Sequence, residues 1–119
     1  MEEPQAKKEY LAEVDRISRK LASERPEYAR GFGGLLSAGA AAGRGDNKRA
    51  LSDLEAAIVQ FDAAGMGLYG ASAKRRWGEC AGGDLGRAQV EQADAWMRAR
   101  AIRNPSRITA MLVPGAFGR

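Results

Sequence analysis

The chain has 119 residues, 15 of them glycine, and carries a formal net charge of +4. This length corresponds to about one domain with a modest core, and the few aromatic residues (7%) with no alternating β-branched run favour close-packed helices over a sheet. With no histidine and one cysteine, the chain lacks the commonest general base and excludes an internal disulfide and a structural zinc site.

The first two predicted helices cover residues 4–24 and 26–42. Arg25-Pro26 separates them, because a residue before proline is pushed out of the helical region and Pro26 fits the first turn of the next helix. The first helix is predicted to carry an apolar stripe of Tyr10, Val14, Ile17 and Leu21, with Leu11 beside it. The second is predicted to bury Phe32, Leu35, Leu36, Gly39 and Ala42. Gly39 weakens this helix, which close packing against another helix would explain.

The third and fifth predicted helices, 46–63 and 84–101, begin in two segments that echo each other 38 residues apart, Gly45–Ala64 and Gly83–Ile102. In each segment a glycine ends the preceding helix and an aspartate, Asp46 or Asp84, caps the new one. A period of this size indicates stacked helical hairpins; the alternative is two ordinary helices that both follow a Gly-Asp turn. The expected buried faces are Ala50, Leu54, Ala57, Ile58 and Phe61 in the first copy, and Leu85, Ala88, Ala95, Trp96, Ala99 and Ile102 in the second.

The fourth predicted helix, 68–81, buries Tyr69, Ala73, Trp77 and Cys80. A short sixth helix follows Asn104-Pro105-Ser106, carries Ile108, Met111 and Leu112, and stops at Pro114-Gly115. We therefore predict an all-α single domain of antiparallel helical hairpins, either a tetratricopeptide-like solenoid end or a small bundle, with about five helices and a C-terminal cap helix. Its parts are a first hairpin (1–44), a first Gly-Asp helix (45–66), a second hairpin (67–102), and a cap helix with tail (103–119).

Few residues suggest chemistry. Cys80 lies on an apolar stripe and is expected to be a small buried hydrophobe, not a reactive thiol. Residues 39–48 are glycine-rich but lack the Gly-Lys-Ser/Thr ending of a phosphate-binding loop. The cluster Lys74-Arg75-Arg76-Trp77 is basic, but consecutive helical residues point about 100° apart and make no patch by themselves. We expect no catalytic residue, no cofactor and no metal ligand.

The N-terminal residues are charged and do not resemble a signal peptide, and no apolar run approaches the roughly 20 residues of a membrane span. The single cysteine fits a reducing compartment. These features predict a soluble cytoplasmic protein without membrane attachment.

Three stretches carry a family resemblance: Gly45–Tyr69 (GDNKRALSDLEAAIVQFDAAGMGLY), Ala73–Arg87 (AKRRWGECAGGDLGR) and Ala93–Gly115 (ADAWMRARAIRNPSRITAMLVPG). Together they resemble the C-terminal tail of large bacterial serine/threonine protein kinases, especially those of myxobacteria, in which tetratricopeptide-like repeats follow the kinase domain. Residues 1–44 resemble the preceding helical pair more loosely. The resemblance implies a protein-interaction or regulatory array, not a kinase, because the chain lacks the kinase nucleotide loop and catalytic motifs.

These observations predict a non-catalytic helical-repeat module that binds a protein partner. Residues 67–119 contain nine basic and four acidic side chains, so acidic groups of a partner are expected to meet the late arginines. The candidate contact residues are Arg75, Arg98, Arg100 and Arg103. One alternative is a helical protein that binds nucleic acid or another polyanion through the same arginines, and another is a structural cap of a longer repeat array.

Overall fold

The computed structural model describes residues 5–23 and 27–118, and most of these residues are helical. The helices of this part of the chain are α1 (Gln5–Ser23), α2 (Glu27–Gly43), α3 (Asn47–Ala63), α4 (Gly67–Ala81), α5 (Gly83–Arg98) and α6 (Pro105–Leu112). The prediction of an all-α fold built from helical hairpins is confirmed. The roles predicted for the Leu21 side chain and for Arg25-Pro26 lie outside the described residues.

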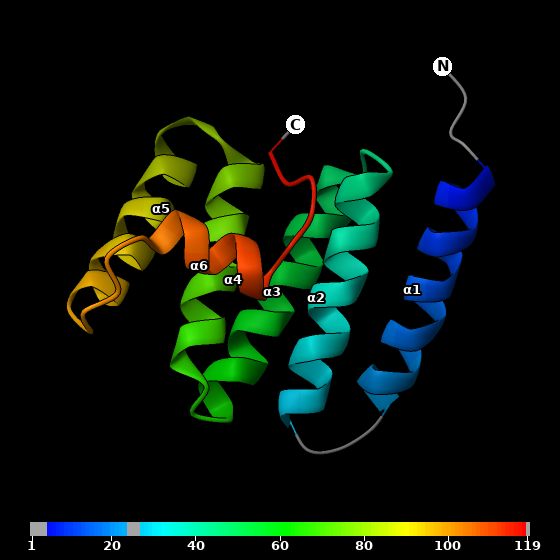
Figure 1. The fold of residues 1–119 in the computed structure, drawn as a ribbon, viewed down its shortest axis with the longest axis horizontal. Helices are drawn as coiled ribbons and strands as arrows, with labels where there is room; N and C mark the ends of the chain where they lie inside the picture. Colours follow the sequence, from blue (N-terminus) through cyan, green and yellow to red (C-terminus); the bar gives the residue numbers. More distant parts are fainter. Residues whose placement is uncertain (1–4, 24–26, 119) are drawn as a thin grey trace.

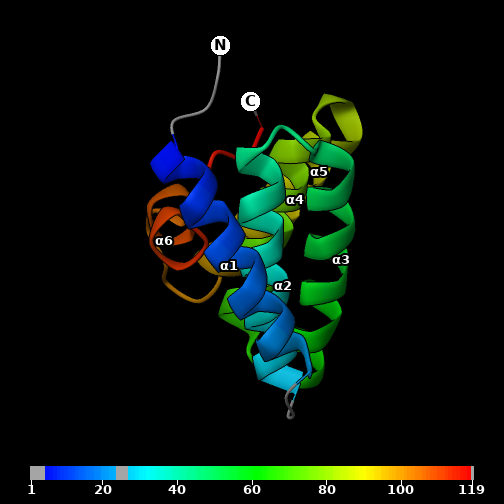
Figure 2. The same ribbon diagram turned by 90° about the vertical axis from the view of Figure 1, so that its right-hand side faces the viewer.

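Helices α1 to α5 pack in chain order, each against the next, and α6 crosses over α4 and α5 (Figure 1). Seen from the α1 side, α2 and α4 lie between α6 on one side and α3 on the other (Figure 2). Short turns enforce this order, because a helix that follows its neighbour after one to three residues has to return beside it. The molecule therefore has two different long faces, one bordered by α3 and α5 and one crossed by α6 and the residues after it.

Three turns share one chain-reversal geometry. At the end of α2, α3 and α5, a carbonyl of the last helical turn accepts a hydrogen bond from the amide five residues later in the chain. Examples are Asp46 N to Ala41 O at 2.8 Å and Met66 N to Phe61 O at 2.9 Å. The residue just before each donor has a left-handed backbone: Gly45 (φ 79°), Gly65 (φ 71°) and, after α5, Ala101 (φ 64°). Glycine adopts this conformation without strain, whereas alanine does not.

The main core lies between α2, α3 and α4. Phe61 is fully buried, and its ring centroid lies 5.2 Å from that of Phe32 and 5.3 Å from that of Tyr69. Glycines let the helices approach closely: a Cβ atom on Gly31 would lie 2.8 Å from the Phe61 ring, and one on Gly78 of α4 would lie 2.5 Å from a backbone oxygen of α5. As predicted, the inner face of α3 is buried, with Ile58 packed at its edge.

The buried face predicted for α5 is wrong in most positions. Leu85 is 64% exposed, and Ala88, Ala95 and Ala99 are exposed, whereas the buried residues of the helix are Gly86, Ala93 and Met97. Small residues occur all around α5, so apolar periodicity alone could not choose its face; the backbone contact between Gly78 and Gly86 sets it. Trp96 and Ile102 are partly buried, as members of a second cluster with Ala71, Ala93 and Met97.

The outer helices also differ from their predicted stripes. In α1, Leu11 is buried while Tyr10 is 67% exposed, because α1 packs on α2 alone. In α6, Pro105 and Thr109 are buried, with Val113 just after the helix, while Met111 is 70% exposed. Of the residues predicted to be buried in α2, Leu35 and Ala42 are buried. Leu36 is 36% exposed, so the prediction for this residue is wrong. An edge helix contacts few neighbours, so part of its apolar surface faces solvent.

The two predicted aspartate caps have different outcomes. Asp46 caps α3, where its carboxylate accepts a hydrogen bond from the Arg49 amide at 3.2 Å. Asp84 does not cap α5, because that helix begins one residue earlier at Gly83, with Gly82 in the capping position. The Asp84 side chain instead lies exposed in the first turn and pairs with Arg87 at 3.2 Å.

Candidate functional site

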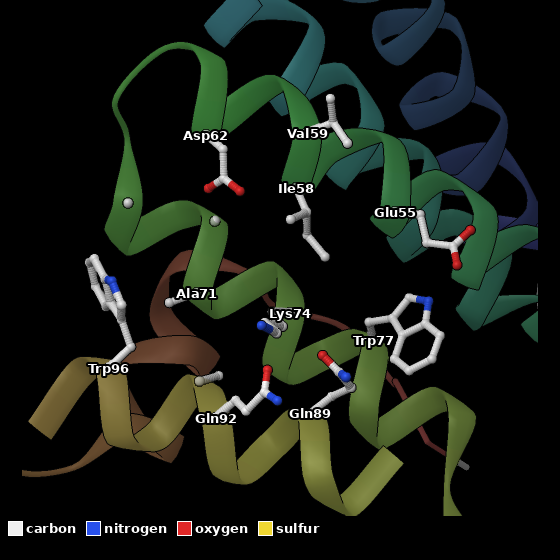
Figure 3. A pocket seen from close by; sticks show the side chains of 13 residues that line it. Glu55, Ile58, Val59, Asp62, Ala71, Lys74, Trp77, Gln89, Gln92 and Trp96 are labelled. Carbon is white, nitrogen blue, oxygen red and sulfur yellow. The ribbon is translucent and has the colours of Figure 1, made fainter. Parts of the chain in front are cut away.

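A groove of about 660 Å³ lies between α3 and α5, with α4 as its floor (Figure 3). Its volume falls within the range of roughly 300–1,000 Å³ that is typical of ligand sites. Side chains spaced three or four residues apart on each helix reach it, as helical geometry requires. Those with functional groups are Glu55 and Asp62 of α3, Lys74 and Trp77 of α4, and Gln89, Gln92 and Trp96 of α5.

Small residues at the start of α4 make the groove hollow. A Cβ atom on Gly67 would lie 2.6 Å from the Trp96 ring, so glycine here lets the indole lie across the beginning of α4. A Cβ atom on Gly70 would lie 2.8 Å from the Asp62 carboxylate. A larger residue at either position would displace a side chain that lines the groove.

The two tryptophans stand at opposite ends of the groove, with Lys74 and the two glutamine amides between them (Figure 3). The indole nitrogen of Trp77 is buried and finds no hydrogen-bond partner among the described residues. An unsatisfied buried donor costs about 1–3 kcal/mol, and because this nitrogen has no accessible surface, an acceptor can reach it only if the indole turns toward the groove.

The other polar groups of the groove are also unpaired. Lys74 is half-buried, and neither it nor Glu55, Asp62, Gln89 or Gln92 has a side-chain hydrogen bond or ion pair with the described part of the chain. Two other charged side chains of α4, by contrast, are paired: Arg75 and Arg76 both have carboxylate partners. The groove thus combines apolar walls with donors and acceptors that are free to bind a ligand.

The four arginines predicted to contact a partner occupy different environments. Arg75 pairs with Asp94 of α5 at 2.8 Å and with Glu79 at 3.5 Å, and its side chain is only 17% exposed, so it links α4 to α5. Arg100 lies 3.7 Å over the Trp96 ring and donates to the Trp96 carbonyl at 3.1 Å, which places it behind one end of the groove. Arg98 and Arg103 are exposed and have no partner among the described residues.

The basic cluster in α4 fans out as helical geometry predicts. Lys74 and Trp77 line the groove, Arg75 lies between α4 and α5, and Arg76 reaches the other side of α4, where its Nε donates to the Val113 carbonyl at 2.8 Å. The prediction that these residues make no common basic patch is therefore confirmed. The sequence singled out this cluster, but neither Lys74 nor Trp77 was predicted to bind a partner, and the other residues of the groove were missed.

The missed residues share a signal that was present in the sequence. Glu55, Val59 and Asp62 form one mixed polar and apolar stripe, and Gln89, Gln92 and Trp96 form another, each at three- or four-residue spacing. Such a stripe borders a core without joining it. Only packing shows that the two stripes face each other across α4.

Cys80 does not belong to the groove. It is buried in the main core, and desolvation raises the pKa of its thiol above the ordinary value, although a backbone hydrogen bond from Gly118 partly opposes this. Within residues 5–23 and 27–118, no group of three or more potential ligands is placed to hold a metal ion. None of the described helices combines the length and apolar character needed to cross a membrane.

Comparisons with known proteins return no relative: no family model, curated protein or solved structure matches this chain.

Proposed function

We propose that this chain is a non-catalytic, protein-binding helical-repeat module, and that its partner docks in the groove between α3 and α5. The observation that carries the proposal is the groove itself, whose Lys74 ammonium and two glutamine amides have no partner within the described part of the chain and stand between two tryptophan side chains. A concave site with apolar walls and a few such polar groups is typical of a ligand-binding site.

The partner that fits is a protein segment with apolar side chains and one acidic side chain. Its apolar groups would pack between Trp77 and Trp96, and its acidic group would meet Lys74. The amides of Gln89 and Gln92 can each donate to and accept from a peptide backbone. Arg100, stacked on Trp96, adds positive charge at the end of the groove, in keeping with the predicted meeting of late arginines and acidic groups.

The rim of the groove favours a peptide over a nucleic acid. Glu55 and Asp62 place two carboxylates along the α3 side, where they would repel a phosphate backbone but tolerate a segment with a single acidic group. The exposed Arg98 projects from α5 about 200° around the helix axis from Trp96, and so away from the groove. A polyanion would have to use that other surface.

The non-catalytic part of the proposal rests on the residues present. The chain has no histidine, and the thiol of Cys80 lies in the core with its pKa raised by burial. The resemblance to kinase tails supports a module that is part of a regulatory array attached to a kinase, and its partner would then be another part of the kinase chain or a kinase regulator. The sequence markers alone support this placement.

The test starts with the full chain and a phage-displayed library of random peptides. Selected peptides are expected to combine aromatic or aliphatic residues with an aspartate or glutamate. Their affinity, measured by fluorescence anisotropy with synthetic peptides, should fall tenfold or more in Lys74→Glu and about three- to tenfold in Trp77→Phe, which replaces the indole by a smaller ring and so removes part of the groove wall together with the N–H donor. The matched control is Lys48→Glu, which makes the same charge change at an exposed residue of α3 that does not line the groove.

Equal affinity of Lys74→Glu and Lys48→Glu for every selected peptide would refute docking in this groove. A labelled single-stranded DNA of 20 nucleotides is tested in parallel at low and physiological salt. If the DNA binds at physiological salt, and Lys74→Glu binds it as well as the wild type, the polyanion alternative replaces the proposal.

A further inference from the structure

The residues after α6 cross the face of the molecule opposite the groove. They leave the helix at Val113 and rise beside α2 (Figure 1), and the Pro114 carbonyl oxygen lies 3.7 Å from the position of a Cβ on Gly39. The close neighbour of Gly39 is therefore this segment, where a partner helix was predicted. Val113 and Phe117 are 2% and 7% exposed and both belong to the main core.

Arg76 contacts this segment at two places, a backbone carbonyl and the Phe117 ring. Its Nε donates to the Val113 carbonyl at 2.8 Å, and its guanidinium lies 5.1 Å from the centre of the Phe117 ring. Glu79 accepts from the same guanidinium at 3.2 Å and fixes its direction. A side-chain donor to a main-chain carbonyl, together with two buried apolar side chains, is a set of contacts that a segment of another protein can also make.

The site of this segment is open along one side. A second groove, of about 480 Å³, lies between α1, α2 and residues 112–116, and it shares no lining residue with the groove between α3 and α5. Tyr10 and Leu36 keep exposed apolar surface there. The segment therefore borders solvent on one flank and can leave α2 and α4 without passing through the core of the α2–α3 hairpin.

We propose that the face formed by α2 and α4 is a second peptide-binding surface, and that the chain's own Val113–Phe117 occupies it as an intramolecular ligand. The partner it fits is a short segment of another protein, with a branched apolar residue and, four residues later, an aromatic ring. Arg76 recognises the carbonyl of the first anchor and the face of the second. This surface is independent of the groove between α3 and α5, and either can fail without the other.

The covalently attached segment competes with any partner. The segment follows α6 directly, and a segment held this close to its site has an effective concentration of at least about the millimolar range, so the intact chain binds the same sequence weakly from solution. A substitution that weakens the contacts of the attached segment with α2 and α4 should therefore strengthen the binding of an added peptide, because the apparent affinity for the peptide rises with the fraction of molecules whose surface is vacant.

The experiment uses the full chain and a fluorescein-labelled peptide with the sequence Leu-Val-Pro-Gly-Ala-Phe-Gly. Phe117→Ala, which removes one anchor of the attached segment, should bind this peptide at least tenfold more tightly than the wild type. Adding Arg76→Met to this variant should remove the gain, as should replacing the phenylalanine of the peptide by alanine. Met111→Ala is the control, because it removes a neighbouring large side chain that is 70% exposed and should leave the affinity unchanged.

Circular dichroism establishes that Phe117→Ala is folded, and hydrogen exchange of the wild type gives a second measure that needs no substitution. The amides of residues 115–118 should exchange faster than those of α3, and excess peptide should accelerate them further. A folded Phe117→Ala that binds no better than wild type, or amides that exchange only with global unfolding, would overturn the proposal. A wild-type dimer in sedimentation that the peptide dissociates would also overturn it, because the partner would then be a second copy of the chain.

Discussion

The crossing of α4 and α5 gives a sharp test of the packing, because two glycines meet there backbone to backbone. A Cβ atom on Gly78 would lie 2.5 Å from the Gly86 carbonyl oxygen and 3.1 Å from the Val90 amide nitrogen. Neither atom is the movable end of a side chain, so Gly78→Ala has to separate the helices. Overpacking of this kind costs about 1–3 kcal/mol, and we take the upper end because the obstacle is main chain.

Alanine also favours the helix over glycine by about 1 kcal/mol, which offsets part of the clash. We therefore expect Gly78→Ala to lower the free energy of unfolding by about 2 kcal/mol. Gly39→Ala is the matched control: Gly39 also lies inside a helix, but its added Cβ would meet only the Pro114 oxygen, at an ordinary 3.7 Å. That variant should gain up to about 1 kcal/mol.

Urea unfolding followed by far-ultraviolet circular dichroism measures both variants. The slopes should match that of the wild type, so the midpoints alone report the change in stability. The two substitutions are chemically identical, and the expected difference between them is about 3 kcal/mol, from the upper overpacking cost. A Gly78→Ala protein as stable as Gly39→Ala would show that α4 and α5 do not cross at Gly78 and Gly86.

Two further predictions concern the turn after α5 and the buried thiol. Ala101 has a left-handed backbone (φ 64°) where the equivalent turns have glycine, so Ala101→Gly should raise the thermal midpoint, with a gain of up to about 1 kcal/mol; an unchanged or lower midpoint would contradict this geometry. Burial raises the pKa of the Cys80 thiol above its ordinary 9.0, so its contribution to stability is fully present below pH 9.0 and lost as the pH rises through the folded-state value. Urea titrations between pH 7 and 10 should show the wild type losing stability relative to Cys80→Ala above pH 9.0, and parallel curves would show that the thiol is not desolvated.

The proposed partner surfaces lie on opposite faces of α4. Lys74 and Trp77 line the groove toward α3 and α5, whereas Arg76 faces the C-terminal segment. Residues 74–77 thus contribute side chains to both surfaces, and Arg75 among them links α4 to α5. This arrangement follows from the rotation of about 100° per residue and needs no special sequence.

The helices and their approximate limits could be predicted from the order of the residues alone. Turn glycines, the Asn104 and Asp46 caps and the apolar spacing of α3 act within one helical turn, so they predicted the helices and most of their limits to within a residue or two. Local interactions of this kind are present before any tertiary contact forms, which is why they can be read from the order of residues.

Tertiary structure alone decided which face of α5 is buried, what lies beside Gly39 and where the grooves are. In α5 small residues occur on several sides of the helix, so the choice of buried face depended on the contact of Gly78 with Gly86, residues on two different helices. The groove residues are separated along the chain and acquire meaning only when α3 and α5 stand on either side of α4. Helix formation depends on neighbours in sequence, whereas a concave site depends on the distance and angle between helices, and these are fixed by packing.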